Sequence, residues 1–142
     1  MKKYISVLCI CIVALVFTSC GNNEIKFEDY EWQLRTAMNI KAEGLVVAVG
    51  EKDEAYPDAE VIDVVLTEKD GELIIEDKTN NETYKGAYEE MYVTPNSEDY
   101  KVIIEGEDGY ATVAYTTYDD GTKELTLPIT VGGYDLYFYV NN

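Results

Sequence analysis

The chain has 142 residues, with 28 acidic side chains against 11 basic ones and no histidine, so its formal net charge is −17 at pH 7. A surface this acidic repels the phosphates of nucleic acid and anionic lipid headgroups, and we expect neither as a partner. The absence of histidine excludes Ser-His-Asp and Cys-His catalysis, and histidine-based zinc sites, from this chain. No glycine-rich loop has the spacing of a nucleotide-binding motif. The composition therefore favours a non-catalytic protein without a cofactor.

The N-terminal segment has the pattern of a secretory signal peptide. Lys2 and Lys3 precede an apolar stretch at 5–17. As a helix, this stretch would be about 20 Å long, which is shorter than the ~30 Å hydrocarbon layer of a membrane. We therefore expect a leader that is removed rather than an anchor that spans the membrane.

The stretch Phe17-Thr18-Ser19-Cys20 resembles the lipobox of bacterial lipoproteins. That resemblance implies that the Cys20 thiol receives a diacylglyceryl group and that the leader is cleaved just before this residue. Cys9 and Cys11 both lie within the leader, so Cys20 would have no internal partner for a disulfide. The alternative is an ordinary signal peptide followed by an incidental cysteine.

Lipidation at Cys20 sets the expected location and the domain division. Two or more acyl chains hold a protein stably on a membrane. We therefore expect an exported lipoprotein on the outer side of the bacterial cytoplasmic membrane, or on the outer membrane. The chain divides into a signal peptide at 1–19, a polar lipidated tether at 20–29 and one domain at 30–142. We expect this domain to be a monomer that contacts the membrane through its lipid.

Beyond the tether, apolar and polar residues alternate and turn signals recur at short intervals, which is typical of an all-β sandwich or barrel. The expected strands lie at 30–38, 62–66, 73–75, 84–88, 102–104, 111–115, 125–129 and 134–140. An open sheet of such strands would leave two exposed edges, which closure removes. We therefore predict an all-β, antiparallel, up-and-down (meander) barrel of these eight strands. Its core should contain Trp32, Leu34, Leu127, Leu136 and Phe138.

Two places in this pattern remain open. The apolar stretch 45–49, within the segment 39–58, fits either an extra strand or a continuation of the first strand. Pro128 cannot donate a ladder hydrogen bond, so it predicts an edge or a bulge near the expected strand 125–129.

The early Trp32, the meandering strands and the lipidated N-terminus together resemble the calycin group, especially small lipocalin-like lipoproteins of bacteria. The resemblance covers most of 30–140 at the level of topology, with Tyr30-Glu31-Trp32 in place of the lipocalin Gly-x-Trp signature. Arg35 is the only arginine of the chain. A barrel of this size holds either packed side chains or one small ligand.

Tyr84, Gly86 and Tyr88 are the candidate ligand-binding residues. If their common face points inward, the missing side chain of Gly86 leaves space, and the two tyrosines supply aromatic walls and hydroxyl groups. Gly86 also fits a bulge or a close approach of two backbones.

Tyr137 and Tyr139 are expected to point outward, together with Asp135, if Leu136 and Phe138 face the core. Every tyrosine except Tyr4 lies after the leader. These tyrosines fit either a recognition surface or ordinary strand packing.

The acidic clusters at 105–108 and 119–120 offer oxygen ligands of the kind that calcium prefers. Both clusters lie at tight turns, where Asp is favoured for backbone reasons. We therefore expect no metal site.

Two functions compete. The leading expectation is an envelope lipoprotein that binds a small apolar or amphipathic molecule inside the barrel. The alternative is a surface module with a filled barrel that contacts a protein or a glycan, and an enzyme that uses carboxylates alone is a third class. An empty apolar cavity would favour the first function, and a filled barrel would favour the second.

Overall fold

The computed structural model describes residues 26–140, so Cys20 and the predicted leader lie outside the described residues. Within this range, ten strands and two 3₁₀ turns follow one another along the chain. The strands are β1 (Trp32–Asn39), β2 (Leu45–Val49), β3 (Glu60–Val61), β4 (Val64–Lys69), β5 (Glu72–Asp77), β6 (Glu82–Val93), β7 (Ser97–Ile104), β8 (Glu107–Thr117), β9 (Lys123–Val131) and β10 (Tyr134–Val140). The turns are η1 (Phe27–Asp29) and η2 (Ile40–Ala42).

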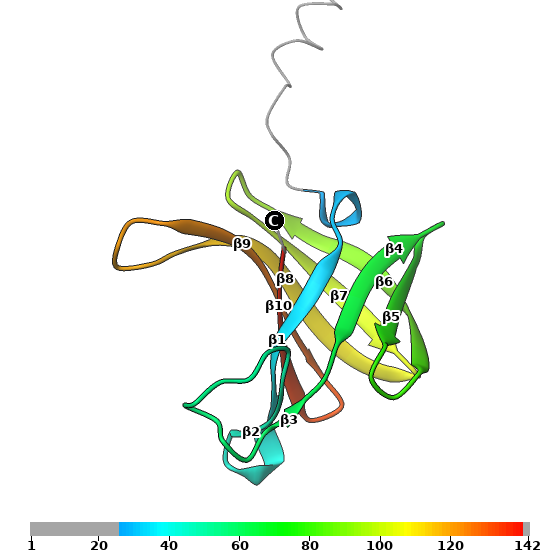
Figure 1. Ribbon diagram of the computed structural model, residues 1–142. Coiled ribbons are helices and arrows are strands. Elements are labelled where there is room, and N and C mark those ends of the chain that lie inside the picture. The colour runs from blue at the N-terminus through cyan, green and yellow to red at the C-terminus, as the bar shows by residue number, and fades with distance from the viewer. Residues whose placement is uncertain (1–25, 141–142) are drawn as a thin grey trace, which may run out of the picture.

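β1 and the strands from β4 to β10 close into an eight-stranded antiparallel up-and-down barrel (Figure 1). Each strand from β4 to β10 pairs with the next, and β10 pairs back with β1. A short contact completes the ring, in which Trp32 and Gln33 of β1 pair with Leu66 and Val65 of β4. The fold class predicted from the alternation of apolar residues is confirmed.

The segment 39–58 contains an extra strand. β2 pairs antiparallel with residues 36–39 of β1, on the edge that β4 leaves free. β3 then pairs in parallel with the end of β2, where Ala48 lies opposite Glu60. In Figure 1, β2, β3 and η2 lie at the end of the barrel opposite η1.

The core fills the inside of the barrel. Trp32, Leu34, Leu127 and Phe138 are each at most 2% exposed, as predicted, and Leu136 is half-buried against the same cluster. Burial of a large apolar side chain contributes about 1.5–3 kcal/mol relative to its exposed state, so each of the fully buried residues stabilises the barrel substantially.

Pro128 interrupts one ladder without opening the barrel. It lies opposite Tyr137 in an unshifted register with β10. On its other side, the pairing of β9 with β8 stops after Ala111–Ile129 and resumes at Ala114–Thr126. The missing proline N–H is therefore accommodated by a gap in the β8–β9 ladder rather than by an edge strand.

η1 covers the end of the barrel at which β1 begins. The Trp32 Nε1 donates a hydrogen bond of 3.0 Å to the Phe27 carbonyl. The Phe27 ring contacts Tyr88 edge-on, with centroids 5.0 Å apart, and lies 5.4 Å from the Tyr100 ring. Phe27 falls within the segment assigned to the tether from sequence, and it is a buried core residue.

Candidate functional site

The interior of the barrel is almost filled by its own side chains. The remaining cavity measures about 10 Å³ and is lined by apolar and aromatic residues that include Phe27, Leu73, Tyr88, Tyr100 and Leu127. About 10–15 Å³ is needed to hold a single water molecule. This cavity therefore has no room for a small-molecule ligand.

Gly86 lies where two backbones approach each other closely. It faces Leu73 on β5 and Ile104 on β7. A Cβ atom added at Gly86 would lie 2.6 Å from the Ile103 carbonyl oxygen and 3.0 Å from a side-chain carbon of Ile104. The space beside this glycine is thus occupied by the neighbouring strand.

Tyr84 and Tyr88 occupy different environments on β6. Tyr84 is exposed, and its hydroxyl donates a hydrogen bond to Glu82, which raises the pKa of Tyr84. Tyr88 lines the small internal cavity, and burial raises the pKa of its hydroxyl. The two side chains therefore do not converge on a common space with Gly86.

A buried polar pair lies next to this cavity. The Tyr100 hydroxyl donates a hydrogen bond to the carboxylate of Glu98, and both residues are buried. Burial, followed by this hydrogen bond, raises the pKa of Tyr100. Because the hydroxyl supplies a partner for the carboxylate, the buried acid does not need an external cation to satisfy it.

A wide concave surface lies on the outside of the barrel. It forms a groove of about 640 Å³, whose lining residues include Arg35, Thr36, Val49 and Tyr139. The loop after β2 contributes residues 51–54 and Tyr56. The groove thus combines tyrosine rings with both acidic and basic groups.

A β-bulge in β1 places two consecutive side chains, Arg35 and Thr36, at the groove. Leu34 lies opposite Phe138, but Thr36 lies opposite Tyr137, so Arg35 is the extra residue in the pairing with β10. Such a residue breaks the alternation of faces, and two consecutive side chains then point the same way. Arg35 and Thr36 both line the groove as a result.

Gly50 joins the loop to this bulge. Its N–H donates a 2.8 Å hydrogen bond to the Arg35 carbonyl. A Cβ atom at Gly50 would lie only 1.9 Å from the Leu34 carbonyl oxygen, which is a severe steric clash for any side chain. The absence of a side chain at this position is therefore required for the loop to contact the bulge.

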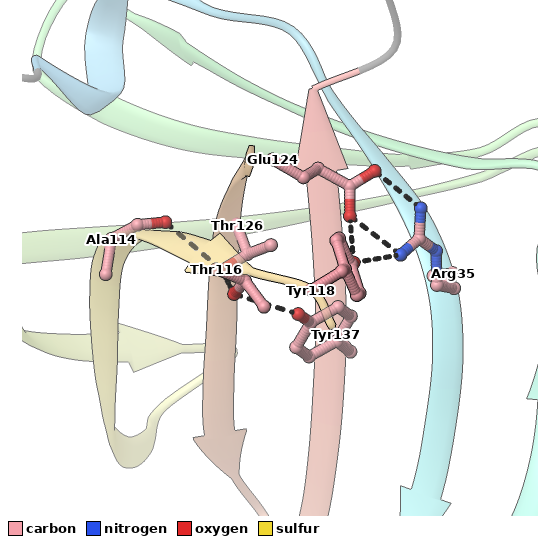
Figure 2. Close-up of polar contacts among 7 residues, drawn as sticks. All are labelled: Arg35, Ala114, Thr116, Tyr118, Glu124, Thr126 and Tyr137. Carbon is pink, nitrogen blue, oxygen red and sulfur yellow. Dashed lines mark hydrogen bonds and ion pairs between the residues drawn. The ribbon is translucent and has the colours of Figure 1, made fainter. Parts of the chain in front are cut away.

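Arg35 is fixed by a polar cluster on the outer face, which Figure 2 shows. Its two terminal nitrogens donate to both oxygens of Glu124 at 2.8 and 2.7 Å, and one also donates to the Tyr118 hydroxyl at 3.0 Å. The Tyr118 hydroxyl donates in turn to Glu124. The guanidinium carbon lies 4.2 Å from the centre of the Tyr139 ring.

The pKa values in this cluster move in the directions expected for an ion pair. The hydrogen bond with Glu124 raises the pKa of Arg35, and the hydrogen bonds from Arg35 lower the pKa of Glu124 despite its partial burial. The pKa of Tyr118 is raised because its hydroxyl donates to the Glu124 carboxylate. All three groups therefore keep their ordinary charge states at neutral pH.

A hydroxyl network lies next to this cluster. Thr116 Oγ1 lies 2.9 Å from Thr126 Oγ1 and 3.4 Å from the Tyr137 hydroxyl, and Thr126 donates to the Ala114 carbonyl at 3.2 Å (Figure 2). Thr126 is only 2% exposed although it does not belong to the apolar core. Side chains on the outside of the barrel, Tyr137 among them, thus form a second packed layer.

Tyr137 and Tyr139 lie outside the apolar core, as predicted, whereas Arg35, Tyr118 and Glu124 were not identified as site residues from sequence. A single arginine in a chain with 28 acidic residues signals an ion pair. The choice of Glu124 could not be predicted, because 89 residues separate the two partners in the sequence.

Between residues 26 and 140, no group of three or more acidic, histidine or cysteine side chains is placed to hold a metal ion. The acids of the turns make local contacts instead. Glu105 accepts a hydrogen bond from the Lys85 N–H, and Asp120 accepts from Thr122, which lowers the pKa of Asp120. No helix in this part of the chain is long and apolar enough to cross a membrane.

Comparison with known proteins gives no match: the chain matches no protein-family model, no curated protein and no solved structure. The structure itself defines the class. The protein is an eight-stranded up-and-down β-barrel, compatible with a lipocalin-like fold, whose interior is almost filled and whose outer face carries a groove of about 640 Å³.

Proposed function

We propose that this protein is a non-catalytic, lipid-anchored protein of the bacterial cell envelope that contacts a protein or a glycan through the outer groove beside Arg35. The observation that carries this proposal is the contrast between a groove of about 640 Å³ outside and a cavity of about 10 Å³ inside. Binding sites are concave and combine apolar contact area with a few fixed polar groups.

The groove has the chemistry of a recognition surface. Tyr56 and Tyr139 offer ring faces for apolar contacts and hydroxyls for hydrogen bonds. Arg35 is held by Glu124 and the Tyr139 ring, so little conformational entropy is lost when a partner contacts it. Tyrosine and arginine are enriched among the residues that contribute most to binding at protein interfaces.

The position of the groove suits a tethered protein. Seven residues of extended chain reach at most about 25 Å, so a lipid on Cys20 would keep Phe27 and the η1 end of the barrel near the membrane. β2 and the loop that follows it approach the opposite end (Figure 1). The groove would then be accessible to partners beyond the membrane surface.

The carrier function stays a competing proposal. A ligand inside the barrel would need the Phe27 ring to leave its position against Tyr88 and Tyr100. Titration of the delipidated protein with fatty acids, sterols and aromatic compounds tests this, with Trp32 fluorescence and melting temperature as signals. A bound ligand at 100 times its Kd stabilises a fold by about 2.7 kcal/mol. We expect no such shift, and a saturable shift would favour the carrier.

The groove is tested by site-specific photocrosslinking in intact cells. A photoreactive amino acid replaces Tyr56, which lines the groove, or Tyr110, which is exposed and does not line it. We expect a discrete adduct from position 56 that is absent from position 110 and is lost when Arg35→Ala is added. Equal adducts from both positions, or an adduct that survives Arg35→Ala, would contradict a contact centred on this groove.

A further inference from the structure

β6 extends beyond the strand that pairs with it on one side. β5 pairs only with residues 82–86 of β6, whereas β7 pairs with β6 from Gly86 as far as Val93. Within residues 26–140, no strand pairs with the other edge of β6 at 87–93. This stretch is therefore an open strand edge of the barrel.

The free backbone groups of this edge belong to Tyr88 and Glu90. The Lys85 carbonyl accepts a hydrogen bond from the Glu105 N–H, so the backbone groups of Lys85 point toward β7. Backbone groups point alternately to the two sides of an antiparallel strand, so those of Ala87 also point toward β7. Tyr88 and Glu90 then present their N–H and C=O groups to the open side, where another strand can pair with them.

The side chains around the edge are apolar and acidic. Met91, Tyr92 and Val93 are 58%, 66% and 41% exposed. Glu89 and Glu90 are also exposed on the strand. Such a surface is suited to an extended partner with apolar side chains and positive charge.

Acidic groups of other elements approach the same strand. Burial is the main cause of the raised pKa of Tyr88, and the negative charges of Glu68 on β4 and Glu28 in η1 raise this pKa further. The basic residue opposite Glu89 is Lys101, and it is already within 3.6 Å of Asp108. The local field is therefore negative.

A second copy of this chain does not fit the edge. Pairing β6 with itself would bring the acidic residues of two copies together, and each copy carries a net charge of −17. The register with β7 shifts between Glu90 and Tyr92, which marks a bulge at Met91. The bulge shortens the regular part of the edge with which a second strand could pair. A bulge and exposed charges are the devices that prevent strand edges from pairing with copies of themselves.

We propose that the open edge of β6 at 87–90 binds an extended, basic segment of a partner protein by β-strand addition. Lysine or arginine on the partner strand would face Glu89 and Glu90, and its backbone would pair with Tyr88 and Glu90. This site uses residues other than those of the groove at Arg35, so either site can fail without the other.

The probe is a synthetic eight-residue peptide in which lysine alternates with valine and threonine, added to the full mature protein. Amide hydrogen exchange measured by NMR reports on Tyr88 and Glu90. We expect fast exchange at both amides in the free protein, and a slowing of at least about tenfold at saturating peptide. A peptide with glutamate in place of lysine, and one with N-methyl groups on the pairing amides, should both fail to protect them.

A matched pair of variants separates the backbone from the charge. Glu90→Pro removes the N–H on the open side but no N–H that faces β7, and Glu90→Gln removes only the charge. We expect Glu90→Pro to abolish the protection of Tyr88 and Glu90→Gln to weaken peptide binding by only a few-fold. If Glu90→Pro does not fold, the N-methylated peptide still tests whether binding depends on backbone hydrogen bonds.

Three results would overturn the proposal. Slow exchange at Tyr88 and Glu90 without peptide would show that the edge is already covered. If the exchange rate does not depend on protein concentration, this chain itself covers the edge, and if the rate falls as the concentration rises, a second copy covers it. Equal binding of the N-methylated peptide would exclude strand pairing. Chemical-shift changes confined to the groove at Arg35 would place the basic peptide there instead.

Discussion

Gly50 shows how one residue shapes the outer groove. Its amide hydrogen bonds to the Arg35 carbonyl, and its lack of a side chain lets the loop cross the bulge of β1. A Cβ atom would lie 1.9 Å from the Leu34 carbonyl oxygen. Backbone atoms cannot rotate away as side chains do, so a larger residue must displace either the loop or β1.

We predict that Gly50→Ala lowers the free energy of unfolding by about 1–3 kcal/mol, the usual cost of forced overpacking. Denaturant unfolding of the purified domain measures this. Gly71→Asn is the control, because Gly71 has open space around it and asparagine tolerates its positive φ of 82°. Equal stability of the two variants would contradict the close contact at Gly50.

Trp32 has two roles that substitutions can separate. It is fully buried, and its indole N–H fixes the Phe27 carbonyl. We predict that Trp32→Ala costs roughly 3–5 kcal/mol. Trp32→Phe keeps much of the volume but leaves that carbonyl without its donor, so its cost should be smaller, about 1–3 kcal/mol. Unchanged melting curves for both variants would place Trp32 outside the core.

At the scale of elements, the ion pair of Arg35 with Glu124 joins β1 to β9, and Tyr118 adds the loop between β8 and β9. Tyr139 of β10 supports the same guanidinium with its ring. Bidentate geometry makes such a pair stronger than a typical surface ion pair. The cluster therefore links strands on both sides of the junction between β1 and β10.

The pKa of Glu124 is lower in the folded protein than its ordinary value of 4.5. A group with a lowered pKa stabilises the fold above its ordinary pKa, and that stability is lost as the pH falls through the folded value. We predict that Glu124→Gln costs roughly 1–2 kcal/mol at pH 7 and that this difference shrinks as the pH falls below 4.5.

Denaturant unfolding of both proteins at several pH values measures this difference. Glu72→Gln is the control, because the pair of Glu72 with Lys85 is exposed and should contribute less than about 0.5 kcal/mol. A Glu124→Gln cost that does not decrease at any pH below 4.5 would contradict the assigned hydrogen bonds.

The alternation of apolar residues predicted the barrel strands, but not how β1 and β6 pair along their lengths. One edge of β1 pairs with β4 at its start and with β2 at its end, and β6 extends beyond the part that pairs with β5. Both features depend on where a neighbouring strand ends. A pattern within one strand carries no information about the length of its neighbour.

At the scale of the whole molecule, the filled interior depends on Phe27. Its ring lies against Tyr88 and Tyr100 and lines the remaining cavity. Removing it would leave an apolar void, and apolar voids in proteins stay dry and bind small aromatic molecules.

We predict that Phe27→Ala lowers the free energy of unfolding by about 3–5 kcal/mol and creates a site for benzene, which the unmodified protein lacks. Thermal melting with and without benzene measures both effects. Tyr134→Ala is the control, because Tyr134 is 41% exposed. Stabilisation of the unmodified protein by benzene would show that the barrel opens without the substitution.

The proposed lipidation of Cys20 is tested on the chain with its predicted leader, since Cys20 lies outside the described residues. We predict that Cys20→Ala yields an uncleaved or unlipidated protein, because no other residue after the leader offers a thiol. Metabolic labelling of cells with a clickable fatty acid measures this, with Cys9→Ala as the control that should keep the label. Equal labelling of the Cys20→Ala protein would contradict lipidation at this position.

The sequence by itself determined the all-β class, the meander of barrel strands, the extremes of charge and most of the core, because strand alternation and turn chemistry are local properties. The filling of the barrel, the bulge at Arg35, the approach of Gly50 to Leu34 and the open edge of β6 were decided only by the tertiary structure. Each of them depends on which atoms of distant strands occupy the same space. Gly86 illustrates the difference, because its missing side chain signals either a cavity or a close contact, and only the position of Ile103 on the neighbouring strand distinguishes the two.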